Sequence, residues 1–357
     1  MHYGQRSHSY EDHSASLDSP FDEDVELFSE SSSSEEALEE QQNASSGFRG
    51  FLKGYTVYDV MPDSGKVIVM DPDLSIAQAI GILMHNEITC TPLWDTETNS
   101  FFGMFTIWDV VDVLLHGYIN AKQTSDWTGE FSYSRDQSLR AWKDTNPKKA
   151  ITITPTCRLM DALSILRSHS LHRLPVVADD GSVVHVISPR RIAAFLVGKY
   201  RKNDDKTLSK TVGQLFSDGI GISDTQKVLT CKKSDLLVDA LKKLHENRIA
   251  SLVVVEEAGN EVKPVDLFNT ADLIPLTYGA SSLFANMTVD HALQYKLQRR
   301  EGLHLVCEDF ILKKLLQTSA QHRVHRFVVV NSDGFLRGLL SVGDVLKSFS
   351  NDDVIPS

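Results

Sequence analysis

Four short frames in the sequence place a hydroxyl or amide residue three positions before a charged residue. They are Thr106 to Asp109, Ser188 to Arg191, Asn269 to Asp272, and Ser341 to Asp344. A short, rigid carboxylate can accept hydrogen bonds from both hydroxyls of a ribose, and a helix N-terminus offers free N–H groups to an anion. Helix capping is the alternative, because these N-cap residues and a first-turn carboxylate both stabilise a helix start. Capping does not predict Arg191, whose positive charge opposes the helix dipole.

Two basic pairs stand between apolar residues, His172-Arg173 in LHRLPVV and His325-Arg326 in VHRFVVV. Arginine binds phosphate oxygens in a bidentate manner, and histidine adds a donor whose charge depends on pH. Basic residues are also favoured where a helix ends, which is the structural alternative for either pair. If the surrounding segments pack with pseudo-symmetry, the two pairs converge with Arg190 or Arg191. Such a positive pocket, combined with the carboxylates, suits a ligand that contains both ribose and phosphate.

The segments around these residues recur four times along the chain. The equivalent positions Thr91, Leu174, Leu252 and Phe327 are separated by 83, 78 and 75 residues. Each segment shows a helical apolar pattern, a β-rich run, a polar turn, a second β run and another amphipathic helix. One such unit is too small to be stable alone, so we expect the units to pair, with the polar connection at 197–210 between the pairs. The sequence predicts an α/β (α+β) fold of four βαββα-like repeats in two tandem pairs.

The net charge and the distribution of apolar residues limit the classes of function that the chain can have. The formal net charge of −12 argues against nucleic-acid or anionic-membrane binding as the principal activity. No apolar run approaches the roughly 18 residues of a membrane span, so we expect an intracellular, cytoplasmic protein and leave a nuclear pool open. Residues 1–47 are rich in Ser, Asp and Glu and predict a disordered acidic tail.

Catalysis finds little support in the sequence. No HExxH, GxSxG or Walker lysine motif is present, and GIGISD at 219–224 lacks the third glycine of a dinucleotide loop, so it is interpreted as a turn. We therefore expect no enzymatic activity, no metal and no cofactor.

The repeats, the segments HRLPVV and HRFVVV, and the frames GMFTIWD and GLLSVGD resemble tandem cystathionine-β-synthase-type (CBS) repeats. More narrowly, YTVYDVMP, CTPLWDTETNSFFGMFTIWDVVDVLL and LRAWKD resemble the γ, nucleotide-sensing subunits of AMP-activated protein kinases. The resemblance covers approximately residues 50–350 and implies repeats at 50–120, 140–200, 212–278 and 284–350. It further implies a flattened disk of two repeat pairs, which binds AMP, ADP or ATP near its centre and assembles with a catalytic α and a scaffold β subunit.

The resemblance also implies roles for individual residues. The ribose-contacting aspartates match Asp109, Asp272 and Asp344, while Arg191 stands where the family has arginine and a site that usually stays empty. The phosphate contacts match six residues: His172, Arg173, Arg190, His325, Arg326 and Lys296. Arg190 stands where a lysine is usual, and Lys296 where an arginine is expected. Thr106, Ser341 and Arg191 are the other nucleotide-site residues in this scheme.

Several positions depart from the family pattern. Thr89 replaces a phosphate-binding arginine, and Gly343 replaces a serine. Losing an arginine fork removes charge-assisted hydrogen bonds of roughly 1.5–3 kcal/mol each, so we expect fewer or weaker sites than in a typical member, with the Asp344 site best preserved. Two alternatives to a nucleotide sensor are a γ-like scaffold with weak or no sensing and a CBS module for another adenosyl ligand.

Overall fold

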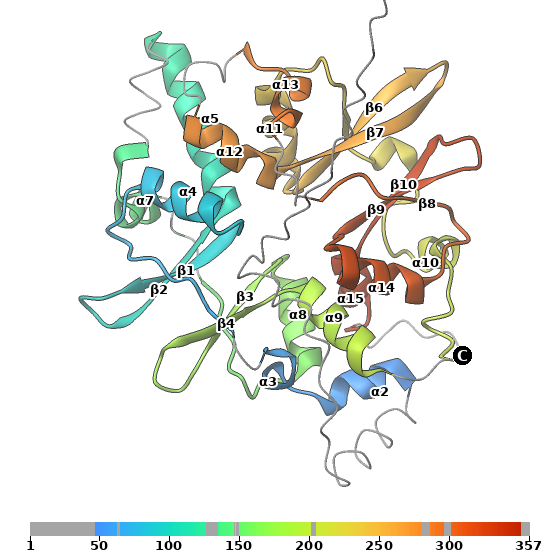
Figure 1. Cartoon of the computed structure of the whole chain (residues 1–357), viewed down its shortest axis with the longest axis horizontal. Coiled ribbons are helices and arrows are strands. Elements are labelled where there is room, and N and C mark those ends of the chain that lie inside the picture. The colour runs from blue at the N-terminus through green and yellow to red at the C-terminus, as the bar shows by residue number, and fades with distance from the viewer. Residues whose placement is uncertain are drawn as a thin grey trace, which may run out of the picture.

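The computed structural model describes residues 47–62, 65–125, 135–145, 147, 150–200, 205–279, 286–295 and 301–350. Within these residues the same succession of helices and strands recurs four times, and the four repeats lie around a common centre (Figure 1). Apart from Gly47, the predicted acidic tail of residues 1–47 lies outside the described residues.

The first two repeats each build a two-stranded antiparallel sheet between helices. In the first, α4 (Ile76–His85) leads to β1 (Cys90–Asp95), β2 (Ser100–Thr106) and α5 (Ile107–Thr124). In the second, α8 (Leu159–Ser168) leads to β3 (Leu174–Val177), β4 (Val183–Ile187) and α9 (Pro189–Lys199). The initial strand of each unit is reduced to one parallel bridge, Met70 with Leu93 and Ile153 with Val176.

The last two repeats keep that initial strand. In the third, β5 (Thr230–Cys231) pairs parallel to β6 (Ser251–Ala258), which pairs antiparallel with β7 (Glu261–Asn269); α11 (Leu237–Asn247) and α12 (Leu273–Gly279) are its helices. In the fourth, β8 (Leu305–Val306) and β10 (Leu336–Ser341) flank β9 (Arg326–Val330), with α14 (Leu312–His322) and α15 (Val342–Ser348). The βαββα order expected from the sequence is thus confirmed.

Apolar helix faces join the repeats across the molecule. The stripe Leu159, Ala162, Leu163 and Leu166 on α8 is completely buried, as its 3.6-residue period predicts. One continuous core combines helices of the second and fourth repeats, and another combines helices of the first and third. A smaller core lies between the strands of the third and fourth repeats. The third and fourth repeats therefore also pack against each other through their strands.

Four short helices that precede the repeats hold the two repeats of each tandem pair together, because each helix contacts the other repeat of its pair. They are α3 (Val57–Val60), α7 (Leu139–Thr145), α10 (Val212–Ser217) and α13 (Val289–Leu293). Their N-terminal ends form single antiparallel bridges: Thr56 with Arg158, Ser75 with Ser138, Thr211 with Ile311, and Leu236 with Thr288. This exchange links the first repeat to the second and the third to the fourth, which confirms two tandem pairs.

Asp205 connects the start of the described chain to the segment between the two pairs. Its carboxylate accepts hydrogen bonds from the backbone N–H groups of Phe48 (3.0 Å), in α2 (Gly47–Gly54), and of Thr207 (2.8 Å), and from the hydroxyl of Tyr200. Burial opposes the charged form, but these hydrogen bonds outweigh it and lower the pKa of Asp205. The side chain therefore stabilises the junction as a carboxylate.

We predict that Asp205→Ala lowers the free energy of unfolding by roughly 2–4 kcal/mol, because buried donors lose a charged acceptor. Denaturant unfolding at pH 7 measures the change. The matched control is Asp309→Ala at an exposed position, which should stay within about 0.5 kcal/mol of the parent chain. A loss at Asp205 no larger than at Asp309 would mean that the junction contributes little to stability.

Candidate functional site

A cavity of about 3300 Å³ lies where the four repeats meet, and residues of every repeat line it. The strand-to-helix junctions of all four repeats reach this cavity, at Thr106, Ser188, Asn269 and Ser341. The His-Arg pairs reach it where the chain enters β3 and β9: His172, Arg173 and His325 precede these strands, and Arg326 is the first residue of β9. The repeat symmetry thus brings the two kinds of sequence frame to one place.

Asp109, in the first repeat, is held by internal contacts. Its carboxylate accepts hydrogen bonds from the backbone N–H (2.8 Å) and the hydroxyl (3.0 Å) of Thr106, which caps α5. The ammonium of Lys143 donates to the other carboxylate oxygen at 2.7 Å, and the Lys143 and Asp109 side chains are only 12% and 1% exposed. A ribose at this position would have to displace a buried ion pair.

Asp272, in the third repeat, is fully buried at the last position of the short helix η3 (Thr270–Asp272), which α12 follows directly. One of its carboxylate oxygens accepts the backbone N–H of Asn269 at 2.9 Å. Although both residues line the cavity, the carboxylate of Asp272 serves the helix start. This hydrogen bond is the one that the capping interpretation predicts for the frame.

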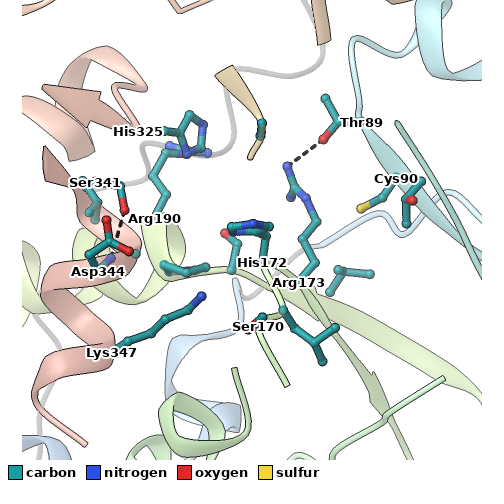
Figure 2. A pocket seen from close by; sticks show the side chains of 18 of the residues that line it. Thr89, Cys90, Ser170, His172, Arg173, Arg190, His325, Ser341, Asp344 and Lys347 are labelled. Carbon is teal, nitrogen blue, oxygen red and sulfur yellow. Dashed lines mark hydrogen bonds between the residues drawn. The ribbon is translucent and has the colours of Figure 1, made fainter. Parts of the chain in front are cut away.

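Asp344, in the fourth repeat, is arranged differently. Here the hydroxyl of Ser341 accepts the backbone N–H of Asp344 at 3.0 Å, so that serine alone caps α15. The Asp344 side chain is exposed to the cavity, and its carboxylate makes no ion pair within the described part of the chain (Figure 2). Of the three aspartates, Asp344 is the one that offers an accessible acceptor pair.

Arg191, in the second repeat, does not line the cavity. Its guanidinium is buried and donates to the backbone carbonyl of Val60 in α3 at 2.8 Å. The structure thus supplies a structural reason for the frame that capping did not predict: Arg191 holds the exchanged helix α3 onto α9. Its neighbour Arg190 lines the cavity instead.

Positive and imidazole side chains converge at the cavity centre. Figure 2 shows His172 between the side chains of Arg173 and Arg190, with His325 beyond Arg190. His172 is exposed to the cavity by surface area, yet the protein groups that surround the cavity partly desolvate its ring. Burial, together with the charges of Lys347 and Arg326, lowers the pKa of His172 to about 4. Both rings are neutral donors near pH 7, since burial and the neighbouring arginines also hold the pKa of His325 well below its usual value.

Thr89 redirects one of these arginines. The guanidinium of Arg173 donates to the hydroxyl of Thr89 at 3.0 Å, which links the second repeat to the first (Figure 2). The family resemblance singled out Thr89 only as a position where an arginine of the family pattern is replaced. In the structure the neutral hydroxyl orients Arg173 toward the first repeat without neutralising its charge.

Glu301 contacts the other arginine, and nothing in the sequence pattern identified it. Its carboxylate accepts the backbone N–H groups of His325 (2.6 Å) and Arg326 (2.7 Å) and pairs with the Arg326 guanidinium at 3.2 Å. Arg326 also donates to the amide oxygen of Asn269 at 3.2 Å. A carboxylate thus occupies donors that the resemblance assigned to phosphate. Glu301 lies 25 residues before Arg326, so no local spacing could reveal the contact.

Lys296 and Gly343 are two further positions that the sequence analysis singled out. Lys296, predicted as a phosphate contact, lies outside the described residues. Gly343 lines the cavity beside Ser341, where a Cβ atom would stand 3.5 Å from the serine hydroxyl. A side chain at that position is therefore sterically possible, and its absence leaves the mouth of the Asp344 site open.

The neutral state of His172 gives a testable pH dependence. The unfolded chain takes up this proton near pH 6.5 and the folded chain near pH 4, so stability tied to the neutral ring is present above about pH 6.5 and is lost as the pH falls toward 4. Proton NMR of the imidazole signals, assigned with His172→Gln, should show a midpoint well below 6. A midpoint near 6.5 would place the ring in ordinary solvent.

Comparison with known proteins supports the repeat assignment. The CBS domain model matches residues 57–116, 145–198, 221–276 and 300–351. The chain is 32% identical over 312 residues to the 5′-AMP-activated protein kinase subunit gamma of Dictyostelium discoideum, covering 85% of this chain and 53% of that relative. It therefore spans about half the length of that relative. It is 27% identical over 314 residues to the subunit of the same name from Kluyveromyces lactis, covering 86% and 92% of the two chains.

A solved structure shows the same fold. A Methanocaldococcus jannaschii protein, described as an archaeal homolog of γ-AMPK, superposes with a TM-score of 0.66 at 18% identity, covering 83% of this chain and all of that one. Among the described residues no helix is long and apolar enough to cross a membrane. The predicted resemblance to kinase γ subunits is confirmed, and the four matches of the family model establish that this chain belongs to the CBS domain family.

Proposed function

We propose that the chain is a non-catalytic regulatory subunit that binds AMP, ADP or ATP in its central cavity and relays the nucleotide state to a protein kinase. One observation carries the proposal: the Asp344 carboxylate faces the cavity that Arg190, His172 and His325 also line. An accessible carboxylate pairs with ribose hydroxyls, and the basic groups pair with phosphate. The names of its relatives point to a kinase assembly. As the family resemblance implies, its partners would be a catalytic α and a scaffold β subunit, in the cytoplasm.

Nucleotide sensing in this proposal is differential binding. AMP and ATP share the adenosine group that Asp344 would recognise, and they differ in the negative charge that meets the basic cluster. A partner that contacts one liganded arrangement better than another is biased by no more than the difference in affinity between the two arrangements.

A second candidate is a γ-like scaffold that holds kinase subunits with weak or no sensing. Two contacts favour it, since Lys143 already pairs with Asp109 and Glu301 already pairs with Arg326. These internal ion pairs reduce the number of sites that a nucleotide can fill without displacing a protein group. A module for another adenosyl ligand is the third possibility, because Asp344 would hold any ribose.

Titration calorimetry with AMP and ATP separates the Asp344 site from the Asp109 site. We predict that Asp344→Asn weakens the strongest binding event about tenfold to a hundredfold, because a neutral amide replaces a charged acceptor of ribose hydroxyls. The matched control, Asp109→Asn, should leave that event unchanged, since Asp109 is engaged by Lys143.

The same titration distinguishes sensor from scaffold. Absence of heat with both nucleotides, in a chain that still captures kinase subunits, would reject the sensor and favour the scaffold. Equal losses in Asp109→Asn and Asp344→Asn would reject the assignment of the principal site.

Glu301 provides an independent prediction. In Glu301→Gln the amide oxygen can still accept the backbone N–H groups of His325 and Arg326, but the negative charge is gone. We expect ATP affinity to rise several-fold, because Arg326 gains net charge for phosphate. An unchanged affinity, with unchanged thermal stability, would show that Arg326 does not face the bound phosphates.

A further inference from the structure

Lys347 is a cavity residue that no sequence motif identified. It lies on α15 three positions after Asp344, so the two side chains share one face of the helix. Both line the cavity, and Figure 2 shows the Lys347 side chain extending toward His172. The helical spacing was available in the sequence, but it gains meaning only once Asp344 is known to face the cavity.

The charge of Lys347 is not balanced by a close carboxylate. Within the described part of the chain Lys347 forms no ion pair, whereas Lys143 pairs with Asp109 at 2.7 Å. Partial burial lowers the pKa of Lys347, and the Asp344 charge only partly opposes that effect. A half-buried ammonium without a partner is costly, and a bound anion would relieve that cost.

Lys347 stands beside the proposed phosphate contacts. After burial, Lys347 is the charge that depresses the pKa of His172 most, ahead of Arg326 and Arg173. Arg326 is balanced by Glu301. Among the residues that the structure describes, the cations near the centre that form no ion pair therefore include Arg173 and Lys347. A phosphate group that accepts a hydrogen bond from His172 would therefore lie close to the Lys347 ammonium.

We propose that Lys347 is a specificity-determining residue of the Asp344 site, which contacts the phosphate chain and favours ATP over AMP. This inference rests on the proposed function, because it assigns the phosphate selectivity of the same site. Each phosphate group adds negative charge to the ligand, and a compact ammonium attracts the more highly charged ligand more strongly.

The test measures AMP and ATP affinities of the full chain by calorimetry, for the parent and for Lys347→Gln and Lys347→Arg. We expect Lys347→Gln to lower ATP affinity about tenfold more than AMP affinity, and Lys347→Arg to keep the parent ratio. Lys314→Gln is the control for loss of one positive charge, because Lys314 is exposed on α14 and does not line the cavity. It should leave both affinities unchanged.

The pKa of His172 is a second readout. It separates a direct effect of the Lys347 charge at the phosphate position from a purely structural role of the Lys347 side chain. Removing the Lys347 charge should raise the pKa of His172 in Lys347→Gln, measured by NMR, and Lys347→Arg should not raise it. An unchanged ATP to AMP affinity ratio in Lys347→Gln, in a parent chain that binds both nucleotides, would overturn the inference and leave the proposed function intact. A parent chain that binds neither nucleotide would overturn both.

Discussion

The positive charges that meet at the centre of the four repeats impose the main physical constraint on this protein. Pseudo-symmetric packing brings Arg173, Arg190 and Arg326 to one cavity, together with Lys347. Charges that are partly withdrawn from water must be paired, hydrogen-bonded or neutralised by a ligand. The contacts of the cavity meet this requirement in different ways. Arg326 is paired by Glu301 and Arg173 is oriented by Thr89, whereas Lys347 keeps an unpaired charge within the described part of the chain.

The same constraint breaks the symmetry of the four frames. All of them begin a helix, so capping explains their polar first residue, but their charged fourth residues have different surroundings. Asp109 forms an ion pair with Lys143, and Asp272 is buried in the first turn after its N-cap residue. Arg191 donates a hydrogen bond to the neighbouring helix α3. In the second and fourth frames serine alone satisfies the cap, and because the fourth frame carries a carboxylate, Asp344 is left for the cavity. One repeated sequence pattern thus produces three structural junctions and one accessible site among the described residues.

The sequence predicts the repeats well because their signals are local. The stripe on α8 and the two β runs of each unit follow from hydrophobic period, and the recurrence at 75 to 83 residues follows from the spacing of equivalent positions. The exchange of the short helices was not predicted, because single bridges such as Thr56 with Arg158 join residues about a hundred positions apart. Long-range pairings of this kind leave no periodic trace.

The site was predictable only in part for the same reason. The side chains that the frames supply could be located, but the groups that compete for them could not. Glu301 and Lys143 reach Arg326 and Asp109 from other segments of the chain, and no spacing in the sequence pairs them. Lys347 lies at helical spacing from Asp344, yet that spacing is uninformative until the orientation of α15 is known. The internal ion-pair partners of the predicted residues therefore decide which of these residues remain accessible to a ligand.

The most direct test of the account is a crystal structure of the chain grown with AMP. The account predicts the ribose hydroxyls within hydrogen-bond distance of the Asp344 carboxylate, and the phosphate oxygens within hydrogen-bond distance of His172 and Arg190. A nucleotide bound elsewhere in the molecule, or a central cavity without nucleotide at saturating AMP, would contradict it.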